Sequence, residues 1–340
     1  MIRVLVVDDS VTARMMLTSI LESDPDIKVV TTASDGREAV ELVPRVKPDL
    51  ITMDIHMPVM DGLKATEQIM AYHPTPILIV STLVKSQMSL AFKAISVGAL
   101  DTIEKPVSEA TSTGHPELIR KVKSFSKIKV VTHLAGRHRE IALSPVQARP
   151  QPEDLKIVAI AASTGGPKAL SRILRSLPAG YGAGVLLVQH ISSGFTDGLA
   201  DWLNSESQIA VRTAERGDRV EPGVALVAPD DFHMLVVDGG HIRLNRGLPI
   251  GGHRPAATVL LTSVAQIYGK NSVGVILTGM GADGAVGIAE IKQAGGKTIA
   301  QDGQSCVVFG MPKVAIEMGV VDRVLPVERI AQGIIDFTME

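Results

Sequence analysis

Five polar residues in the first third of the chain each follow a short apolar run. They are Asp8, Asp9, Asp54, Ser81 and Lys105. Carboxyl ends of parallel strands meet at one sheet edge, so these side chains are expected to converge. Three converging carboxylates repel one another unless a hard dication lies between them, and Mg²⁺ prefers oxygen ligands. A carboxylate beside Mg²⁺ and a lysine can attack phosphorus to give an acyl phosphate, and the Ser81 hydroxyl could bond the new phosphoryl oxygens. The alternative is that the acidic residues only cap helices.

A hydroxyl, an imidazole and a carboxylate follow three apolar runs in the second half of the chain. Ser163 precedes Gly165 and Gly166, which permit a tight turn into a helix. The helix amides beside such a turn could stabilise an oxyanion. His190 could take the proton from Ser163, and Asp283 could fix the tautomer of His190. These three residues therefore form a candidate hydrolytic triad.

Each of the three residues also has a simpler interpretation. Ser163 could only cap a helix, His190 could be a core histidine, and Asp283 could cap a loop. The segment around Ser163 is not G-x-S-x-G, and the chain order Ser, His, Asp differs from that of the common nucleophile-elbow hydrolases. The sequence alone therefore leaves the triad open.

A dinucleotide-binding loop is a competing interpretation of the same region. Residues Gly279–Gly284 match G-x-G-x-x-G between an apolar run and a helical segment, and Asp302 follows 18 residues after Gly284. The carboxylate of Asp283 would face a pyrophosphate in such a loop, which is unfavourable, and the loop would give Ser163 no role.

Apolar runs alternate with helical periodicity in both halves of the chain. In the first half the runs are Val4–Val7, Leu50–Met53, Ile77–Val80 and Leu100–Ile103, and a last helix is predicted near Glu117–Ser126. Such runs suit parallel strands buried on both faces, and their alternation with helices predicts an α/β sheet.

A second α/β pattern follows a segment rich in proline and basic residues. That segment, 128–153, is interpreted as a linker between domains at 1–127 and 154–340. The second domain is also expected to contain a hairpin near Leu235–Leu244. Its predicted strands are Lys156–Ala162, Val185–Val188, Val224–Val227, Val273–Leu277 and Thr298–Ala300, and its predicted helices are Pro167–Leu177, Pro255–Tyr268, Gly284–Ala294 and Val327–Phe337.

Composition excludes several classes of protein. The 340 residues suggest about two domains, and 34 basic against 36 acidic residues give a net charge of −2. That balance argues against a nucleic-acid-binding surface. No apolar run approaches the roughly 18 residues of a membrane helix, and the start does not resemble a signal peptide. We expect a soluble cytoplasmic protein without membrane insertion; the single cysteine, Cys306, excludes an intrachain disulfide.

The first 125 residues resemble the response-regulator receiver family, which has a flavodoxin-like fold. The resemblance rests on Val6–Ser10, Met53–Gly62, Ser81-Thr82 and Glu104–Pro106. It implies that a partner histidine kinase phosphorylates Asp54. It further implies that Asp8, Asp9 and Asp54 hold Mg²⁺, while Ser81 and Lys105 sense the phosphoryl group.

Nearly the whole chain resembles the chemotaxis protein-glutamate methylesterase family, which joins a receiver to a Rossmann-like parallel-sheet esterase domain. The second-half motifs that carry it are Ala162–Gly166, Gln189-His190 and Thr278–Gly284. Supporting segments are Gly217–Val220, His253–Pro255 and Gly310–Pro312. By resemblance Ser163, His190 and Asp283 are the catalytic triad. Met280 is implied to contribute an oxyanion-hole amide, and Thr164 to lie beside the nucleophile.

The resemblance also implies a function and partners. The implied activity is phosphorylation-activated hydrolysis of glutamate γ-methyl esters on chemoreceptor helices, with release of methanol and deamidation of receptor glutamines. The implied cofactor is Mg²⁺ in the receiver, with none in the esterase domain. Two alternatives stay open at this point: a receiver that controls a non-enzymatic binding module, and a dinucleotide-binding output domain.

Overall fold

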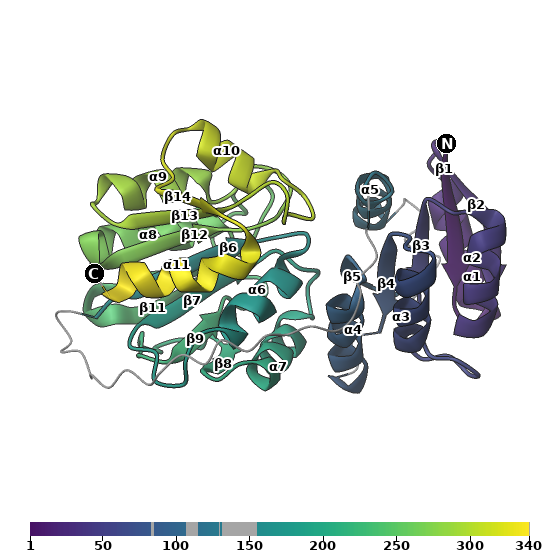
Figure 1. The fold of residues 1–340 in the computed structure, drawn as a ribbon, viewed down its shortest axis with the longest axis horizontal. Coiled ribbons are helices and arrows are strands. Elements are labelled where there is room, and N and C mark those ends of the chain that lie inside the picture. Colours follow the sequence, from purple (N-terminus) through teal and green to yellow (C-terminus); the bar gives the residue numbers. More distant parts are fainter. Residues whose placement is uncertain (83–84, 107–114, 129, 131–154, 340) are drawn as a thin grey trace. The chain divides into compact units, whose positions relative to one another are not determined.

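The computed structural model describes residues 1–82, 85–106, 115–128, 130 and 155–339 (Figure 1). The chain divides into two units, Met1–Arg139 and Glu140–Glu340. The predicted linker, 128–153, lies outside the described residues apart from 128 and 130. Among the described helices, none is long and apolar enough to cross a membrane.

A sheet of parallel strands forms the centre of the first unit. Its strands are β1 (Ile2–Val7), β2 (Ile27–Ala33), β3 (Leu50–Met53), β4 (Ile77–Ser81) and β5 (Asp101–Glu104). The strand order is β2-β1-β3-β4-β5, with every pairing parallel. The order reverses between β1 and β3, and ligands of such sheets bind at the carboxyl ends of the strands where this happens.

Helices cover both faces of this sheet. They are α1 (Val11–Glu22), α2 (Gly36–Val46), α3 (Gly62–Tyr72), α4 (Lys85–Val97) and α5 (Pro116–Phe125). Right-handed crossovers put α1 on one face and α2, α3 and α4 on the other. In agreement, α2 contacts α3, α3 contacts α4, and α1 contacts α5. The strand residues Val4–Val7 are at most 1% exposed, as expected between two helical layers.

The second unit contains a larger parallel sheet with the same kind of reversal. Its strands are β6 (Ile157–Ala162), β7 (Gly184–Gln189), β8 (Ala210–Thr213), β9 (Val224–Val227), β12 (Ser272–Ile276), β13 (Lys297–Gln301) and β14 (Arg323–Leu325). The order is β14-β13-β12-β6-β7-β9-β8, with all pairings parallel. The chain runs from β6 toward β7 first and later returns to β12 on the other side, so the reversal falls between β6 and β12.

Two sets of helices pack against the larger sheet (Figure 1). One set is α6 (Gly166–Arg175), α7 (Thr196–Glu206) and α11 (Val327–Met339). The other is α8 (Ala257–Tyr268), α9 (Ala285–Gln293) and α10 (Met311–Glu317). A hairpin of β10 (His233–Val237) and β11 (His241–Asn245) contacts α8, and the positive φ angles of Gly239 (74°) and Gly240 (72°) allow its tight turn.

The predicted fold class is confirmed: both units are parallel α/β structures, and the hairpin lies where it was expected. The predicted strands and helices are present with ends shifted by at most two residues, and Leu50–Met53 and Val224–Val227 match the observed strands without a shift. The sequence analysis did not identify β2, β8 and β14. All three are edge strands with few fully buried residues, so they lack the continuous apolar run that marks a central strand.

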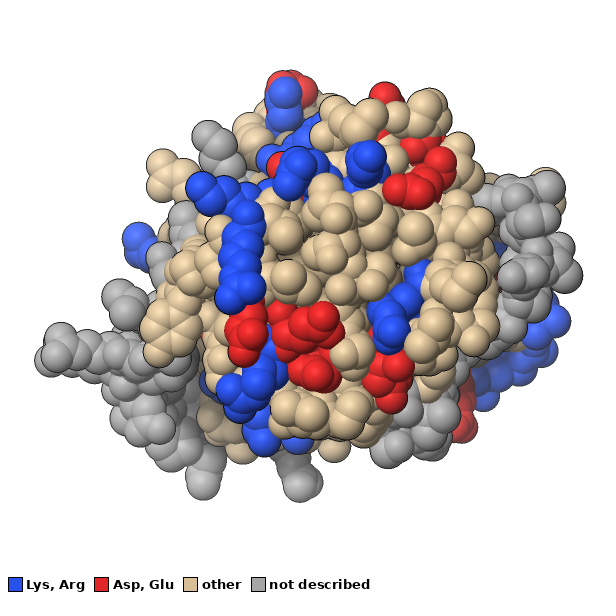
Figure 2. Space-filling view, turned by 90° about the vertical axis from the view of Figure 1, so that its right-hand side faces the viewer, with Lys and Arg blue, Asp and Glu red and all other residues tan. Residues whose placement is uncertain are grey.

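Charged side chains of both signs are mixed on the face drawn in Figure 2. Basic and acidic groups lie next to one another there, with uncharged areas between them. This mixture agrees with the small net charge of −2.

Candidate functional site

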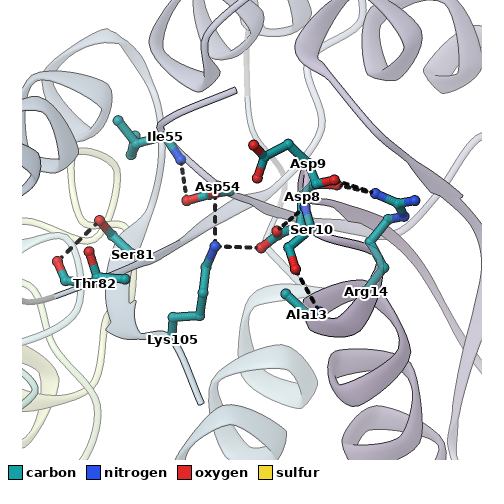
Figure 3. Close-up of polar contacts among 10 residues, drawn as sticks. All are labelled: Asp8, Asp9, Ser10, Ala13, Arg14, Asp54, Ile55, Ser81, Thr82 and Lys105. Atoms are coloured by element: carbon teal, nitrogen blue, oxygen red, sulfur yellow. Dashed lines mark hydrogen bonds and ion pairs between the residues drawn. The ribbon is translucent and has the colours of Figure 1, made fainter. Parts of the chain in front are cut away.

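Three carboxylates converge at the carboxyl ends of β1 and β3, where the smaller sheet reverses its order (Figure 3). One carboxylate oxygen from each of Asp8, Asp9 and Asp54 lies within 4.8 Å of the others. Asp8 and Asp54 are buried, whereas Asp9 is exposed. An all-oxygen set of this kind, open on one side, fits a hard divalent cation that keeps some of its water. The predicted convergence of these residues is thus seen in the structure.

Lys105 neutralises part of this negative charge. Its Nζ lies 2.7 Å from Asp8 Oδ2 and 2.8 Å from Asp54 Oδ2. Burial raises the pKa of Asp54 and the ion pair with Lys105 opposes this rise. Burial by itself would lower the pKa of Lys105, but the hydrogen bonds to Asp54 and Asp8 raise it overall. The lysine therefore stays charged and within reach of any group attached to Asp54.

Hydrogen bonds hold the Asp54 carboxylate and the Asp8 backbone in place. The amide of Ile55 donates to Asp54 Oδ1 at 2.8 Å, and the guanidinium of Arg14 donates to the Asp8 carbonyl at 2.7 Å. Ser10 caps α1 by accepting a hydrogen bond from the amide of Ala13. So Ser10, rather than Asp8 or Asp9, caps this helix, and both aspartates remain available for other contacts.

Ser81 lies at the end of β4, the strand next to β3. It is fully buried, and its hydroxyl donates to the Thr82 carbonyl at 3.4 Å (Figure 3). Figure 3 shows Ser81 and Lys105 on the Asp54 side of the acidic group. Strand order therefore places the hydroxyl, the phosphoacceptor candidate and the lysine along one edge.

The second unit places Ser163 immediately after β6, in the turn that leads into α6. Gly165 adopts a positive φ of 78° there, which a residue with a side chain rarely adopts. The Ser163 amide donates to the Thr278 carbonyl at 3.0 Å, which ties the turn to the end of β12. Ser163 is 9% exposed and Thr164 is 8% exposed, so solvent reaches both only narrowly.

His190 and Asp283 form a buried pair at the same sheet edge. His190 Nε2 lies 2.9 Å from Asp283 Oδ2, and both side chains are 7% exposed. An ionised carboxylate only accepts hydrogen bonds, so the Nε2 atom carries the proton and Nδ1 carries a lone pair. Among the described residues, the buried Nδ1 atom has no hydrogen-bond partner. The imidazole therefore presents a free basic nitrogen.

The Asp283 carboxylate is anchored on the first turn of α8. It accepts hydrogen bonds from the amides of Ala257 (2.7 Å) and Thr258 (3.0 Å) and from the Thr258 hydroxyl (2.7 Å). Burial by itself would raise the pKa of Asp283, but the hydrogen bonds from His190 and Thr258 hold it well below its usual range. Asp283 therefore stays ionised at neutral pH.

Sequence reasoning missed two residues that contact this pair. Thr258 was not singled out, although it donates to Asp283 and accepts from the Gly284 amide at 2.9 Å. His253 stacks on His190 with ring centroids 3.8 Å apart and planes 2° from parallel. The only sequence signal was the segment His253–Pro255, which the family resemblance included without giving it a role.

The loop that carries Met280 passes close to Ser163. A Cβ atom on Gly279 would lie 2.6 Å from the Ser163 Cβ, so only glycine permits this approach. The loop is supported by the segment that follows β13, because the Gly279 amide donates to the Val308 carbonyl at 3.0 Å. Gly279, the residue before Met280, thus lies against the Ser163 turn.

Ser163 and His190 are not hydrogen-bonded to each other through their side chains in the part of the chain that the structure describes. Their backbones are nonetheless adjacent, because the His190 amide donates to the carbonyl of Ala162 at 2.9 Å. Catalytic hydrogen bonds are often long in unliganded enzymes, so this geometry is compatible with proton transfer.

The dinucleotide interpretation of Gly279–Gly284 gains no support from these contacts. Asp302, the acidic residue noted after this loop, accepts hydrogen bonds from the Ser305 amide (2.9 Å) and hydroxyl (2.7 Å). The ionised carboxylate of Asp283 lies within the loop and would repel a pyrophosphate.

Comparison with known proteins identifies a family for each of the two units. Residues 158–334 match the CheB methylesterase family, and residues 4–113 match the response regulator receiver domain. The chain therefore belongs to the CheB methylesterase family and also carries a receiver domain.

Relatives that align over nearly their whole length include two proteins named protein-glutamate methylesterase/protein-glutamine glutaminase. One, numbered 3, is from Anaeromyxobacter dehalogenans and is 46% identical over 97% of each chain. The other is from Pyrococcus abyssi and is 45% identical over 98% of this chain and 93% of that protein. The crystal structure of the Thermotoga maritima CheB methylesterase catalytic domain matches with a TM-score of 0.52 and 43% identity, covering 54% of this chain and 98% of that domain.

Cys306 is a second potential nucleophile close to the site, and its surroundings make it unreactive. Burial raises the pKa of the Cys306 thiol to about 12, although a hydrogen bond with Thr278 opposes the rise. The thiol is therefore protonated at pH 8.

We expect native protein to resist alkylation by iodoacetamide at pH 8. We also expect the Cys306→Ser variant to keep its hydrolase activity. Rapid alkylation of the native protein with loss of activity would contradict this assignment; urea-unfolded protein is the positive control.

Proposed function

We propose that the protein hydrolyses glutamate γ-methyl esters on chemoreceptor helices and deamidates receptor glutamines, for adaptation in chemotaxis-type signalling. The observation that carries the proposal is the buried Asp283–His190 pair, whose free Nδ1 atom lies at the same sheet edge as Ser163. The names of the full-length relatives support the same activity.

Ser163 acts as the nucleophile in this proposal. Its Oγ attacks the ester carbonyl while His190 Nδ1 takes the hydroxyl proton, and Asp283 stabilises the resulting imidazolium. The amide of Met280 stabilises the oxyanion of the tetrahedral intermediate, with Thr164 beside the nucleophile. His190 then returns the proton to the departing methoxide, and methanol leaves.

Hydrolysis of the acyl-enzyme completes the cycle. A water molecule attacks the acyl carbon and gives its proton to His190, which passes it to Ser163 as the glutamate carboxylic acid leaves and ionises. A glutamine side chain follows the same route with ammonia in place of methanol. One site therefore serves both acyl-transfer reactions.

The receiver supplies control in this proposal. A histidine kinase transfers a phosphoryl group to Asp54, and Asp8, Asp9 and Asp54 are the residues that would hold Mg²⁺. A bound Mg²⁺ would offset the negative charge of the incoming phosphoryl group. Lys105 and Ser81 would then bond the phosphoryl oxygens. A tenfold activation needs a free-energy difference of only about 1.4 kcal/mol between two states of the protein.

We expect Ser163→Ala to abolish methanol release from methylated receptor membranes without unfolding the protein, because the proposed acyl-enzyme forms on the Ser163 Oγ atom. Ser176→Ala, at the other end of α6, is the control, since its hydroxyl donates to the Arg172 carbonyl of the same helix. Near-normal turnover by pure Ser163→Ala protein would disprove the triad assignment.

Phosphodonor response tests the assignment of Asp54. A small phosphodonor such as acetyl phosphate is expected to raise methanol release by the wild-type protein and to leave the rate of Asp54→Ala unchanged. Asp49→Ala is the matched control, because this carboxylate precedes β3 and bonds the amide of Arg3 instead. A phosphodonor response that persists in Asp54→Ala would show that the phosphoacceptor lies elsewhere.

A further inference from the structure

Gln189 connects the two residues proposed to exchange a proton. It is the last residue of β7 and is 3% exposed. Its side-chain Nε2 atom donates to the Ser163 carbonyl at 2.8 Å and to the His190 carbonyl at 2.7 Å. A single amide group thus binds the backbone of both residues.

Both hydrogens of this amide are used. Two carbonyl oxygens can only face the NH₂ end of a glutamine, which fixes the orientation of the side chain. The other end, Oε1, is buried and has no hydrogen-bond partner among the residues that the structure describes. The side chain is therefore held by its contacts with Ser163 and His190.

Gly166 leaves room for the Gln189 amide. A Cβ atom on Gly166 would lie 2.0 Å from Gln189 Oε1, which is far inside van der Waals contact. Gly166 is a helical residue at the start of α6 and does not have a positive φ, so its backbone conformation does not require glycine. A side chain is missing here because it would overlap with Gln189 and also come within 2.8 Å of the Ala162 Cβ atom.

The strand pairing alone does not fix the two residues. The register between β6 and β7 ends at Ala162 opposite Gln189, and one further bond joins the His190 amide to the Ala162 carbonyl. Ser163 lies beyond that last contact, in the turn. Beyond the last contact between β6 and β7, the Gln189 side chain joins the Ser163 carbonyl to the His190 carbonyl.

We infer that Gln189 is a positioning residue, which holds the backbones of Ser163 and His190 at the separation that proton transfer needs. The inference rests on the proposed function, since it assumes that these two residues react together. Misplacement of a catalytic group by about 1 Å can lower a rate by about 10²-fold. Without the Gln189 amide, the Ser163 and His190 carbonyls lose the donor that they share, while the bonds from the Ser163 amide to Thr278 and from the His190 amide to Ala162 remain.

The test is Gln189→Met, which keeps the length of the side chain and removes its donor. We expect kcat for methanol release to fall about 100-fold with KM within about twofold of wild type. The rate at which a sulfonyl fluoride inactivates Ser163 is expected to fall by a similar factor, because this small reagent does not depend on receptor docking.

Thr298→Val is the matched control for stability. Thr298 is fully buried, and its hydroxyl also has two backbone partners, the Val320 carbonyl and the Asp322 amide. It lies toward the amino end of β13, at the opposite edge of the sheet from Ser163. We expect it to lower the melting temperature as much as Gln189→Met while kcat and the inactivation rate stay near wild type.

Gly166→Ala provides an independent variant if Gln189→Met does not fold. It keeps the amide but puts a methyl group where Oε1 lies, so the same loss of kcat and of sulfonyl fluoride reactivity is expected. Wild-type kcat and inactivation rate in the folded variants, or an equal loss in Thr298→Val, would overturn the inference. A wild-type protein that reacts with the sulfonyl fluoride but releases no methanol would instead refute the proposed function, while the inactivation rates would still test Gln189.

Discussion

The site of Ser163, His190 and Asp283 depends on one buried carboxylate that is held by four hydrogen bonds. Asp283 accepts three from the first turn of α8 and one from His190 Nε2. A buried carboxylate is costly unless its oxygens are satisfied, and the amides of a helix N-terminus satisfy them well. With Asp283 ionised and fixed, the proton of His190 is confined to Nε2 and the lone pair to Nδ1. The first turn of α8 therefore determines, through Asp283, that Nδ1 is the basic nitrogen of His190.

Both units use the same architectural constraint for different chemistry. Each sheet is parallel and has a reversal of strand order, between β1 and β3 in one and between β6 and β12 in the other, and the polar residues gather at the carboxyl ends of the strands near it. In the smaller sheet, Asp8 and Asp54 meet there and Lys105 offsets their charge. In the larger sheet, the ends of β6, β7 and β12 bring a hydroxyl, an imidazole and a carboxylate to one edge instead. A single fold type therefore supports the proposed cation and phosphoryl site in one unit and the proposed proton-transfer site in the other.

The sequence predicted the central strands and the residues that follow them because both leave a local signal. A fully buried parallel strand is a short apolar run, and a polar residue directly after it must lie at the sheet edge. The edge strands β2, β8 and β14 carry no such run. The contacts of Thr258 and His253 were also unpredictable, since Asp283 bonds a helix that begins about 25 residues earlier in the chain. Pattern and spacing locate a residue on an element, whereas these contacts depend on how two elements pack.

The central claim, that Asp283 and His190 activate Ser163, can be tested by locating the nucleophile chemically. The protein would be treated with a fluorophosphonate, which reacts with activated serines, and the adduct mapped by mass spectrometry of proteolytic peptides. The account predicts an adduct on Ser163 that forms in the wild-type protein and is lost in His190→Ala and strongly slowed in Asp283→Asn. An adduct on another residue, or labelling of Ser163 at the wild-type rate in His190→Ala, would contradict it.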